Sequence, residues 1–216
     1  APRCSIPAGA SRTVGTGGTP LYALYAREED GPIVYELLTA APADWSGNYV
    51  ITNNTTNTGS MYVLKGVAGS ANGTNVENSN NRSKLADSGI TLDGNTMSGV
   101  ANDYVITLSK NGSYYTVKSA AAGCYYGISS SYLYAYSSVN STNCDWTPDI
   151  NNSGLVQLKN KVGGNYPYFG WSSSKNYFWA SSSNKNADIL KLYKEKHTSV
   201  TYYRTDPVDP PDPVDV

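Results

Sequence analysis

Residues Tyr125–Asp145 read YYGISSSYLYAYSSVNSTNCD, and residues Tyr168–Asp188 read YFGWSSSKNYFWASSSNKNAD. The two stretches align without gaps at an offset of 43 residues, and nine of their 21 positions are identical. In order, the identical residues are Tyr, Gly, three consecutive Ser, Tyr, Ser, Asn and Asp. The chain is rich in Ser, but that bias does not explain matches at Tyr, Gly, Asn and Asp. An internal repeat of this kind indicates a fold built from similar structural units.

The repeat extends upstream and includes a third, weaker copy. The segment YTVKS (Tyr115–Ser119) precedes the first stretch, and VQLKN (Val156–Asn160) precedes the second. YVITN (Tyr49–Asn53) matches these opening segments, and MYVLKG (Met61–Gly66) matches the segment that follows them. The sequence therefore contains three related units rather than two.

One aspartate near the end of each unit sets the period. Asp103, Asp145 and Asp188 are 42 and 43 residues apart, and each is followed by a strand-like segment. The first unit is longer because it contains a polar insertion, Val67–Gly89, rich in Asn, Ser and Gly. Insertions of this composition are typical of surface loops, so we predict that this segment forms one.

Each unit has the pattern of an all-β fold. Short runs of β-branched and aromatic residues alternate with turns that contain Gly, Ser, Asn or Asp, in the order of four short strands per unit. Three units of about 42 residues predict a β-trefoil, because threefold repetition closes the sheet and removes its exposed edges. The expected fold is therefore an all-β trefoil whose first repeat carries a loop insertion.

This spacing, with an aspartate before the closing strand of each unit, resembles the β-trefoil superfamily that includes the ricin-B-type lectin domains. Those lectins carry a Q-x-W signature at the end of each repeat, whereas this chain has Asp-Trp, Asp-Tyr and Asp-Ile. The sugar sites of that superfamily therefore do not transfer to this sequence residue by residue.

A second resemblance concerns the setting of the chain. The run VYELLTAAPADWSGNYVITN and the segment ILKLYKE are similar to modules appended to large secreted proteins of gut bacteria, including some extracellular nucleases. The run PLYALYA resembles the final strand of the Listeria–Bacteroides-type repeat of surface proteins. Both resemblances imply a secreted or cell-surface, multidomain bacterial protein, and neither implies a ligand.

Composition divides the chain into three parts. Residues 1–44 are expected to be the end of a preceding repeat plus a hinge, residues 45–195 the β-trefoil domain, and residues 196–216 a Pro- and Asp-rich linker. Within the first part, we predict a strand at Leu21–Ala26, a polar turn at Arg27–Gly31 and a second strand at Ile33–Leu38. The start at Ala1 is interpreted as that of an excised or mature piece.

Charge and hydropathy argue against two classes of partner. The chain has 16 basic and 17 acidic side chains, and its lysines are scattered rather than clustered, so we expect no nucleic-acid binding. No apolar run approaches the ~20 residues that span a membrane, so we expect no membrane insertion.

The cysteines leave two alternatives open. Cys4, Cys124 and Cys144 lack C-x-x-C spacing, and His197 is the single histidine, so the sequence predicts neither a metal nor a cofactor. Cys124 and Cys144 lie in one repeat and could form a disulfide if the fold brings them together. Alternatively, both are small buried thiols.

The acidic residues do not predict an enzyme. Asp103, Asp145 and Asp188 occupy equivalent places, which a threefold fold separates by more than the ~5–9.5 Å of a glycosidase carboxylate pair. Each is expected instead to cap a turn by accepting backbone N–H groups. No nucleophile, metal or phosphate-binding motif is present, so we predict a chain without catalytic residues.

Aromatic residues supply the candidate site. Trp146 and Phe169 are expected in the core, whereas Tyr and Trp side chains on one face of two strands are expected to be exposed. The predicted ligand-binding residues are Tyr132, Tyr134, Tyr136, Trp171, Tyr177 and Trp179.

The function expected from this surface is non-catalytic binding, with the chain acting as a monomeric, adhesin-like module of a larger extracellular protein. Exposed aromatic rings with many Asn and Ser suit a host or microbial glycan. The same composition suits a host secreted protein such as mucin or immunoglobulin, because antibody binding loops are similar in composition. A passive spacer domain is the third alternative.

Overall fold

The computed structural model describes residues 22–54, 60–139, 143–162, 164–182 and 190–207. These residues contain 16 strands, paired into one sheet, together with short 3-10 helices. The prediction of an all-β chain is therefore confirmed. The repeated Asp188 lies outside the described residues.

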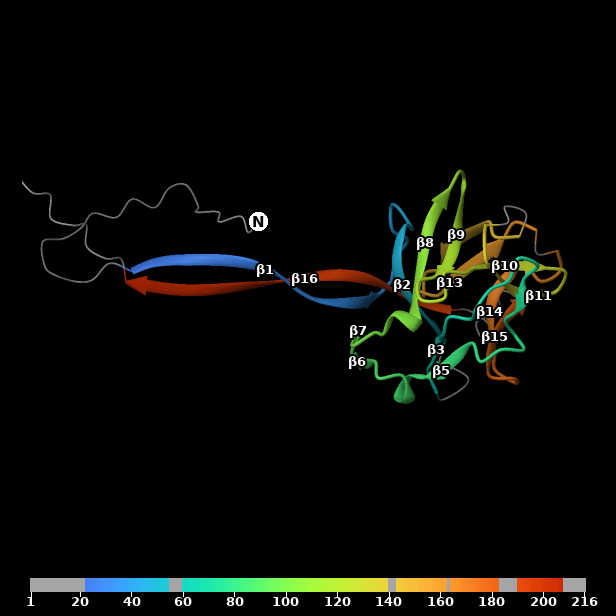
Figure 1. Cartoon of the computed structure of the whole chain (residues 1–216), viewed down its shortest axis with the longest axis horizontal. Coiled ribbons are helices and arrows are strands. Elements are labelled where there is room, and N and C mark those ends of the chain that lie inside the picture. Colours follow the sequence, from blue (N-terminus) through green and yellow to red (C-terminus); the bar gives the residue numbers. More distant parts are fainter. Residues whose placement is uncertain (1–21, 55–59, 140–142, 163, 183–189, 208–216) are drawn as a thin grey trace, which may run out of the picture. The chain divides into compact units, whose positions relative to one another are not determined.

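Figure 1 labels most of these elements along the chain. The strands are β1 (Tyr22–Leu37), β2 (Gly47–Asn53), β3 (Tyr62–Leu64), β4 (Thr74–Asn75), β5 (Arg82–Lys84), β6 (Thr91–Asp93), β7 (Thr96–Ser98), β8 (Val105–Asn111), β9 (Tyr114–Ser119), β10 (Tyr125–Ser129), β11 (Tyr132–Tyr136), β12 (Trp146–Ile150), β13 (Val156–Asn160), β14 (Tyr168–Ser172), β15 (Tyr177–Ser181) and β16 (Leu190–Pro207). The 3-10 helices are η2 (Leu85–Asp87) and η3 (Asn102–Tyr104).

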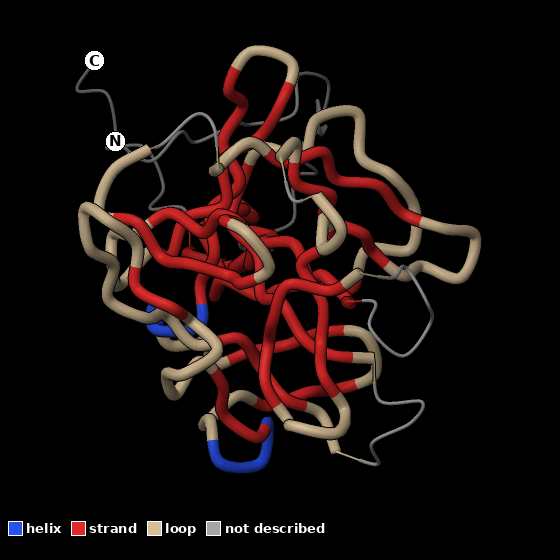
Figure 2. The backbone as a smooth tube through the Cα atoms, turned by 90° about the vertical axis from the view of Figure 1, so that its right-hand side faces the viewer, coloured by secondary structure: helices blue, strands red, loops and turns tan. Residues whose placement is uncertain are grey.

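Two compact units divide the chain. The main unit comprises Val34–Lys196, and the other comprises Ala1–Ile33 with His197–Val216. In this second unit, the described residues are the outer parts of β1 and β16, which are neighbouring strands. The candidate site lies wholly within the main unit, whose short strands are joined by loops (Figure 2).

The strand pairings of the main unit connect six strands in succession. β2 pairs with β8, β8 with β9, β9 with β12, β12 with β13, β13 with β16, and β16 with β2. Each of these strands therefore has two partners within the set. The hairpins β10–β11 and β14–β15 branch from β9 and β13, and β3 branches from β2.

Two apolar clusters stabilise this arrangement. The larger one contains Trp146 and Phe169, whose rings are 5.7 Å apart, so both are core residues as predicted. The indole Nε1 of Trp146 donates to the carbonyl oxygen of Tyr126 at 2.9 Å, which satisfies its buried donor. The smaller cluster joins Val50 to Met97 and other residues from β1, β7 and β16.

The prediction that residues 67–89 form a surface loop is wrong for the middle of this insertion. There β4 pairs with β11, and Val76 is fully buried in the larger cluster. Asn81 is also fully buried, and its Nδ2 donates to the carbonyl oxygens of Val76 at 3.1 Å and Phe178 at 2.8 Å. The polar composition predicted exposure, but the amide of Asn81 is buried and satisfies two backbone carbonyl groups there.

The predicted turn at Arg27–Gly31 is also wrong, because β1 continues through it. The neighbouring strand β16 continues in the same way to Pro207, so residues 196–207 of the predicted linker are strand, and residues 208–216 lie outside the described residues. The Thr198 hydroxyl donates to the carbonyl oxygen of Pro32 at 2.8 Å. Pairing between two distant segments thus overrides the local turn preference of Asp and Gly.

Candidate functional site

The six predicted binding residues divide into four that reach the surface and two that do not. Tyr132 is 48% exposed, and Tyr134, Tyr177 and Trp179 are partly exposed. These four side chains are called the aromatic edge below. Tyr136 and Trp171 are buried.

The aromatic edge follows from the alternation of two strands. On β11, Leu133 and Ala135 are fully buried between the exposed positions, and on β15 Phe178 and Ala180 are fully buried in the same way. Successive side chains of a strand point to opposite faces, so the residues between these buried ones point away from the core. The repeat therefore places equivalent aromatic residues on the outer faces of β11 and β15.

Tyr136 continues the outward alternation of β11 but is covered by the loop that contains Gly73 and by Asn143. A Cβ added at Gly73 would lie 2.8 Å from Cε1 of Tyr136, so the backbone of this loop lies directly against the ring. On another side, Nδ2 of Asn143 donates to the Tyr136 hydroxyl at 3.0 Å. The prediction that Tyr136 is exposed is therefore wrong, since strand alternation does not indicate which distant segments cover a side chain.

Trp171 belongs to the core, so the expectation that its side chain is exposed is also wrong. Its ring stacks on Tyr62 with centroids 4.8 Å apart and meets Phe178 edge-on at 5.0 Å. The alignment of the two repeats contains a signal for this, because Trp171 aligns with Ile128, which is also fully buried. In contrast, Tyr177 aligns with Tyr134.

Glu77, from the insertion, joins the strands that carry the aromatic edge. Its Oε1 accepts the backbone N–H of Leu133 at 3.0 Å and that of Ala180 at 3.1 Å, so one carboxylate oxygen bridges β11 and β15. Burial raises the pKa of Glu77, and the two backbone hydrogen bonds oppose that rise. Sequence reasoning missed this residue because its partners are backbone groups of distant repeats.

Lys175 adds a cation to the aromatic edge. Its Nζ lies 5.7 Å from the ring centroid of Tyr177, within the range of a cation–π interaction. The pKa of Lys175 is raised, first by a hydrogen bond with Tyr177, and Glu77 and Tyr132 contribute in the same direction. The edge thus combines aromatic rings with one cation and one carboxylate.

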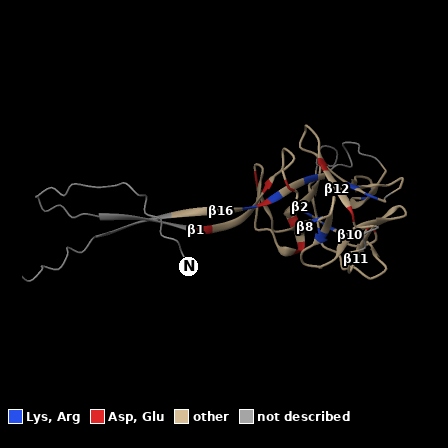
Figure 3. Ribbon diagram, turned by 90° about the horizontal axis from the view of Figure 1, so that it is seen from above, with Lys and Arg blue, Asp and Glu red and all other residues tan. Residues whose placement is uncertain are grey.

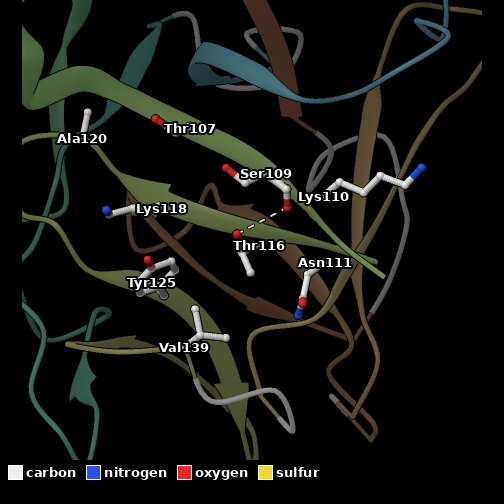
Figure 4. A pocket seen from close by; sticks show the side chains of 9 residues that line it. All are labelled: Thr107, Ser109, Lys110, Asn111, Thr116, Lys118, Ala120, Tyr125 and Val139. Atoms are coloured by element: carbon white, nitrogen blue, oxygen red, sulfur yellow. Dashed lines mark hydrogen bonds between the residues drawn. The ribbon is translucent and has the colours of Figure 1, made fainter. Parts of the chain in front are cut away.

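A second surface feature is a hollow on the outer face of the β8–β9–β10 region. Its volume is about 510 Å³, and Lys118 and Tyr125 lie next to each other on its lining (Figure 4). Over the rest of the main unit, basic and acidic residues are interspersed (Figure 3).

Asp103 and Asp145 differ from the backbone caps that the sequence predicts. Asp145 is buried, and it accepts from Nδ2 of Asn111 at 2.9 Å and from Nζ of Lys161 at 3.3 Å. Asp103 is exposed and lies 3.9 Å from the ammonium group of Lys65. Both carboxylates therefore interact with side chains.

Neither a protein-family model nor a curated protein matches this sequence. Within the described ranges, no group of three or more His, Cys, Asp and Glu side chains is arranged to hold a metal ion. The same part of the chain contains no helix of the length and apolar character needed to cross a membrane.

The thiols of Cys124 and Cys144 are both buried, and the two residues are not joined by a disulfide. Sγ of Cys124 lies 2.8 Å from the carbonyl oxygen of Val67, and burial raises the pKa of this thiol. We therefore expect a Cys4→Ser variant to react slowly with a maleimide when folded and to gain two labels in denaturant, as measured by mass spectrometry. A denatured, unreduced chain that gains none would instead indicate a disulfide between Cys124 and Cys144.

Proposed function

We propose that residues 34–196 form a β-trefoil of three repeats that serves as a non-catalytic, extracellular binding module for a glycan. The closed succession of pairings among β2, β8, β9, β12, β13 and β16 supports the trefoil, because these are the first and last strands of the three repeats. The secreted or cell-surface setting rests on the sequence resemblances to modules of gut bacterial proteins.

The aromatic edge is the observation that carries the binding proposal. Tyr132 keeps 48% of its surface exposed although its strand packs on the core through Leu133 and Ala135. Tyr and Trp rings offer rigid, amphipathic area at a low entropic cost, which suits the C–H faces of a sugar ring. The ammonium group of Lys175 lies 5.7 Å from the centroid of the Tyr177 ring and can donate to sugar hydroxyl groups.

Tyr132→Ala and Tyr177→Ala are expected to weaken glycan binding by about tenfold to thirtyfold each, the usual effect of truncating an aromatic contact residue. An array that carries mucin glycans, plant and microbial polysaccharides and purified host proteins identifies the ligand. Titration calorimetry with that ligand then gives the affinities. Tyr114→Ala is the matched control, since Tyr114 is a partly exposed tyrosine on a different hairpin.

The change at Tyr132 should leave the free energy of unfolding within about 0.5 kcal/mol of the original value, because the side chain is exposed. Unchanged glycan affinity in both variants would remove the aromatic edge from the proposal. A signal on host proteins that survives removal of their glycans would favour the protein-binding alternative. No signal on the array would leave a spacer domain.

A further inference from the structure

Three side chains form a row across adjacent strands at the hollow. Thr107 of β8 lies opposite Lys118 of β9, and Lys118 lies opposite Tyr125 of β10. The ammonium nitrogen of Lys118 lies 5.3 Å from the centroid of the Tyr125 ring. All three positions face away from the core, since their neighbours Leu108, Val117 and Tyr126 are fully buried.

The same row occurs a second time in the next repeat. Thr147 of β12 lies opposite Lys159 of β13, and Lys159 lies opposite Tyr168 of β14. Thr147 and Lys159 are exposed, and Tyr168 is partly exposed. The two rows therefore present a hydroxyl, a cation and an aromatic ring in one order on equivalent strands.

The first repeat does not carry this row. At the corresponding strands β16, β2 and β3, Lys191 lies opposite Thr52, and Thr52 lies opposite Val63. Thr52 and Val63, which hold the places of the lysine and the tyrosine, are both fully buried. Val63 belongs to the smaller apolar cluster, which covers this part of the sheet. The Thr–Lys–Tyr combination is thus present where the sheet face is open and absent where it is covered, which argues against a purely structural role.

The surroundings of the first row favour an anionic ligand. Lys118 lines the hollow of about 510 Å³. The other lining residues contribute a second lysine and several hydroxyl groups, but no carboxylate. The nearby carboxylate of Asp145 is already bound by Asn111 and Lys161. Lys110 extends away from the other lining side chains, so Lys118 is the cation that faces them (Figure 4).

We propose that the two Thr–Lys–Tyr rows are equivalent binding sites for an acidic sugar, a pyranose that bears a carboxylate or a sulfate. The lysine binds the anionic group, and the tyrosine ring packs on the C–H face of the sugar. The threonine oxygen accepts from a ring hydroxyl, because the Thr107 hydroxyl itself donates to Oδ1 of Asn48 at 2.8 Å. These residues are distinct from the aromatic edge, so the inference does not depend on the function proposed for that edge.

The second row is expected to bind more weakly than the first. Asp149 lies two residues after Thr147 on the same face of β12, where its carboxylate accepts the N–H of Ile150 at 2.8 Å. Ser109 holds the corresponding place beside Thr107. A negative charge beside the Lys159 row opposes an anionic ligand, whereas a serine beside the Lys118 row does not.

Titration calorimetry at low salt tests the proposal with five probes: a glucuronate-containing tetrasaccharide, a sulfated tetrasaccharide, a neutral tetrasaccharide of similar size, sodium sulfate and a single-stranded oligonucleotide. We expect at least one acidic sugar to bind two sites per chain, the neutral sugar at least about tenfold more weakly, and affinity to fall as salt is added. Lys118→Met should remove the tighter site, Lys159→Met the weaker one, and the double variant both. Lys84→Met, which changes an exposed lysine of β5, is the matched control.

Each result bears on the proposal directly. Loss of one site in each single variant, with unchanged circular dichroism, supports it, and the double variant should keep any binding that depends on Tyr132. Equal affinity for the neutral sugar, equal affinity for sulfate alone, or unchanged binding in the double variant would each overturn it. Binding of a single-stranded oligonucleotide in preference to every sugar would also overturn it, since a nucleic acid can stack on tyrosine and pair with lysine as well.

Discussion

Replacing Trp171 with alanine is expected to lower the free energy of unfolding by about 3–5 kcal/mol, the usual cost of removing a large aromatic side chain from a core. Trp171 is fully buried and contacts the rings of Tyr62 and Phe178, which come from two other strands. A cavity at this place would separate β3 from the hairpin β14–β15. Chemical denaturation followed by tyrosine and tryptophan fluorescence measures the loss.

Trp171→Phe is the matched control, and its cost should be much smaller. The indole Nε1 of Trp171 is buried and has no hydrogen-bond partner among the described residues, so phenylalanine removes an unsatisfied donor while keeping an aromatic ring. If Trp171→Ala were as stable as the original chain, the placement of this residue in the core would be contradicted.

Replacing Glu77 with alanine is expected to cost about 2–3 kcal/mol. The change leaves the backbone N–H groups of Leu133 and Ala180 without their acceptor, and both residues are fully buried. Glu77→Gln keeps an oxygen at the same position and should retain most of the stability. Urea denaturation of the two variants gives their free energies of unfolding and so separates the contribution of the hydrogen bonds from that of the charge.

The contribution of Glu77 to the stability of the fold depends on pH. Because burial raises the pKa of Glu77 in the folded state, folding favours its protonated form, and this residue contributes more stability as the pH falls through the raised pKa. The stability of the original chain relative to Glu77→Gln should therefore increase from neutral to mildly acidic pH. A difference that decreases over this range would contradict the raised pKa.

The repeat made the strand faces of the main unit predictable. The alignment of Tyr134 with Tyr177 indicated equivalent positions on β11 and β15, and alternation around Leu133 and Phe178 gave the buried face. The same alignment, applied to Trp171 and Ile128, would have placed that tryptophan in the core.

Other features depend on contacts that no single segment encodes. Tyr136 is buried because the 69–73 loop and Asn143 lie against it, and Glu77 acts on backbone groups that are 56 and 103 residues away. Similarly, β1 continues through Arg27–Gly31 because a strand from the far end of the chain pairs with it. Periodicity predicts which side of a strand faces the core, but it does not predict which distant segment covers the other side.

The pairing of β1 with β16 has a consequence for how this protein responds to mechanical load. The contacts of Pro32 with Thr198 and of Glu36 with Lys196 show that the two strands run in opposite directions. Tension applied at Tyr22 and Pro207 would therefore act at one end of this ribbon and open its hydrogen bonds one after another rather than together. A ribbon loaded in this way extends at low force, because each step breaks only the hydrogen bonds nearest the loaded end.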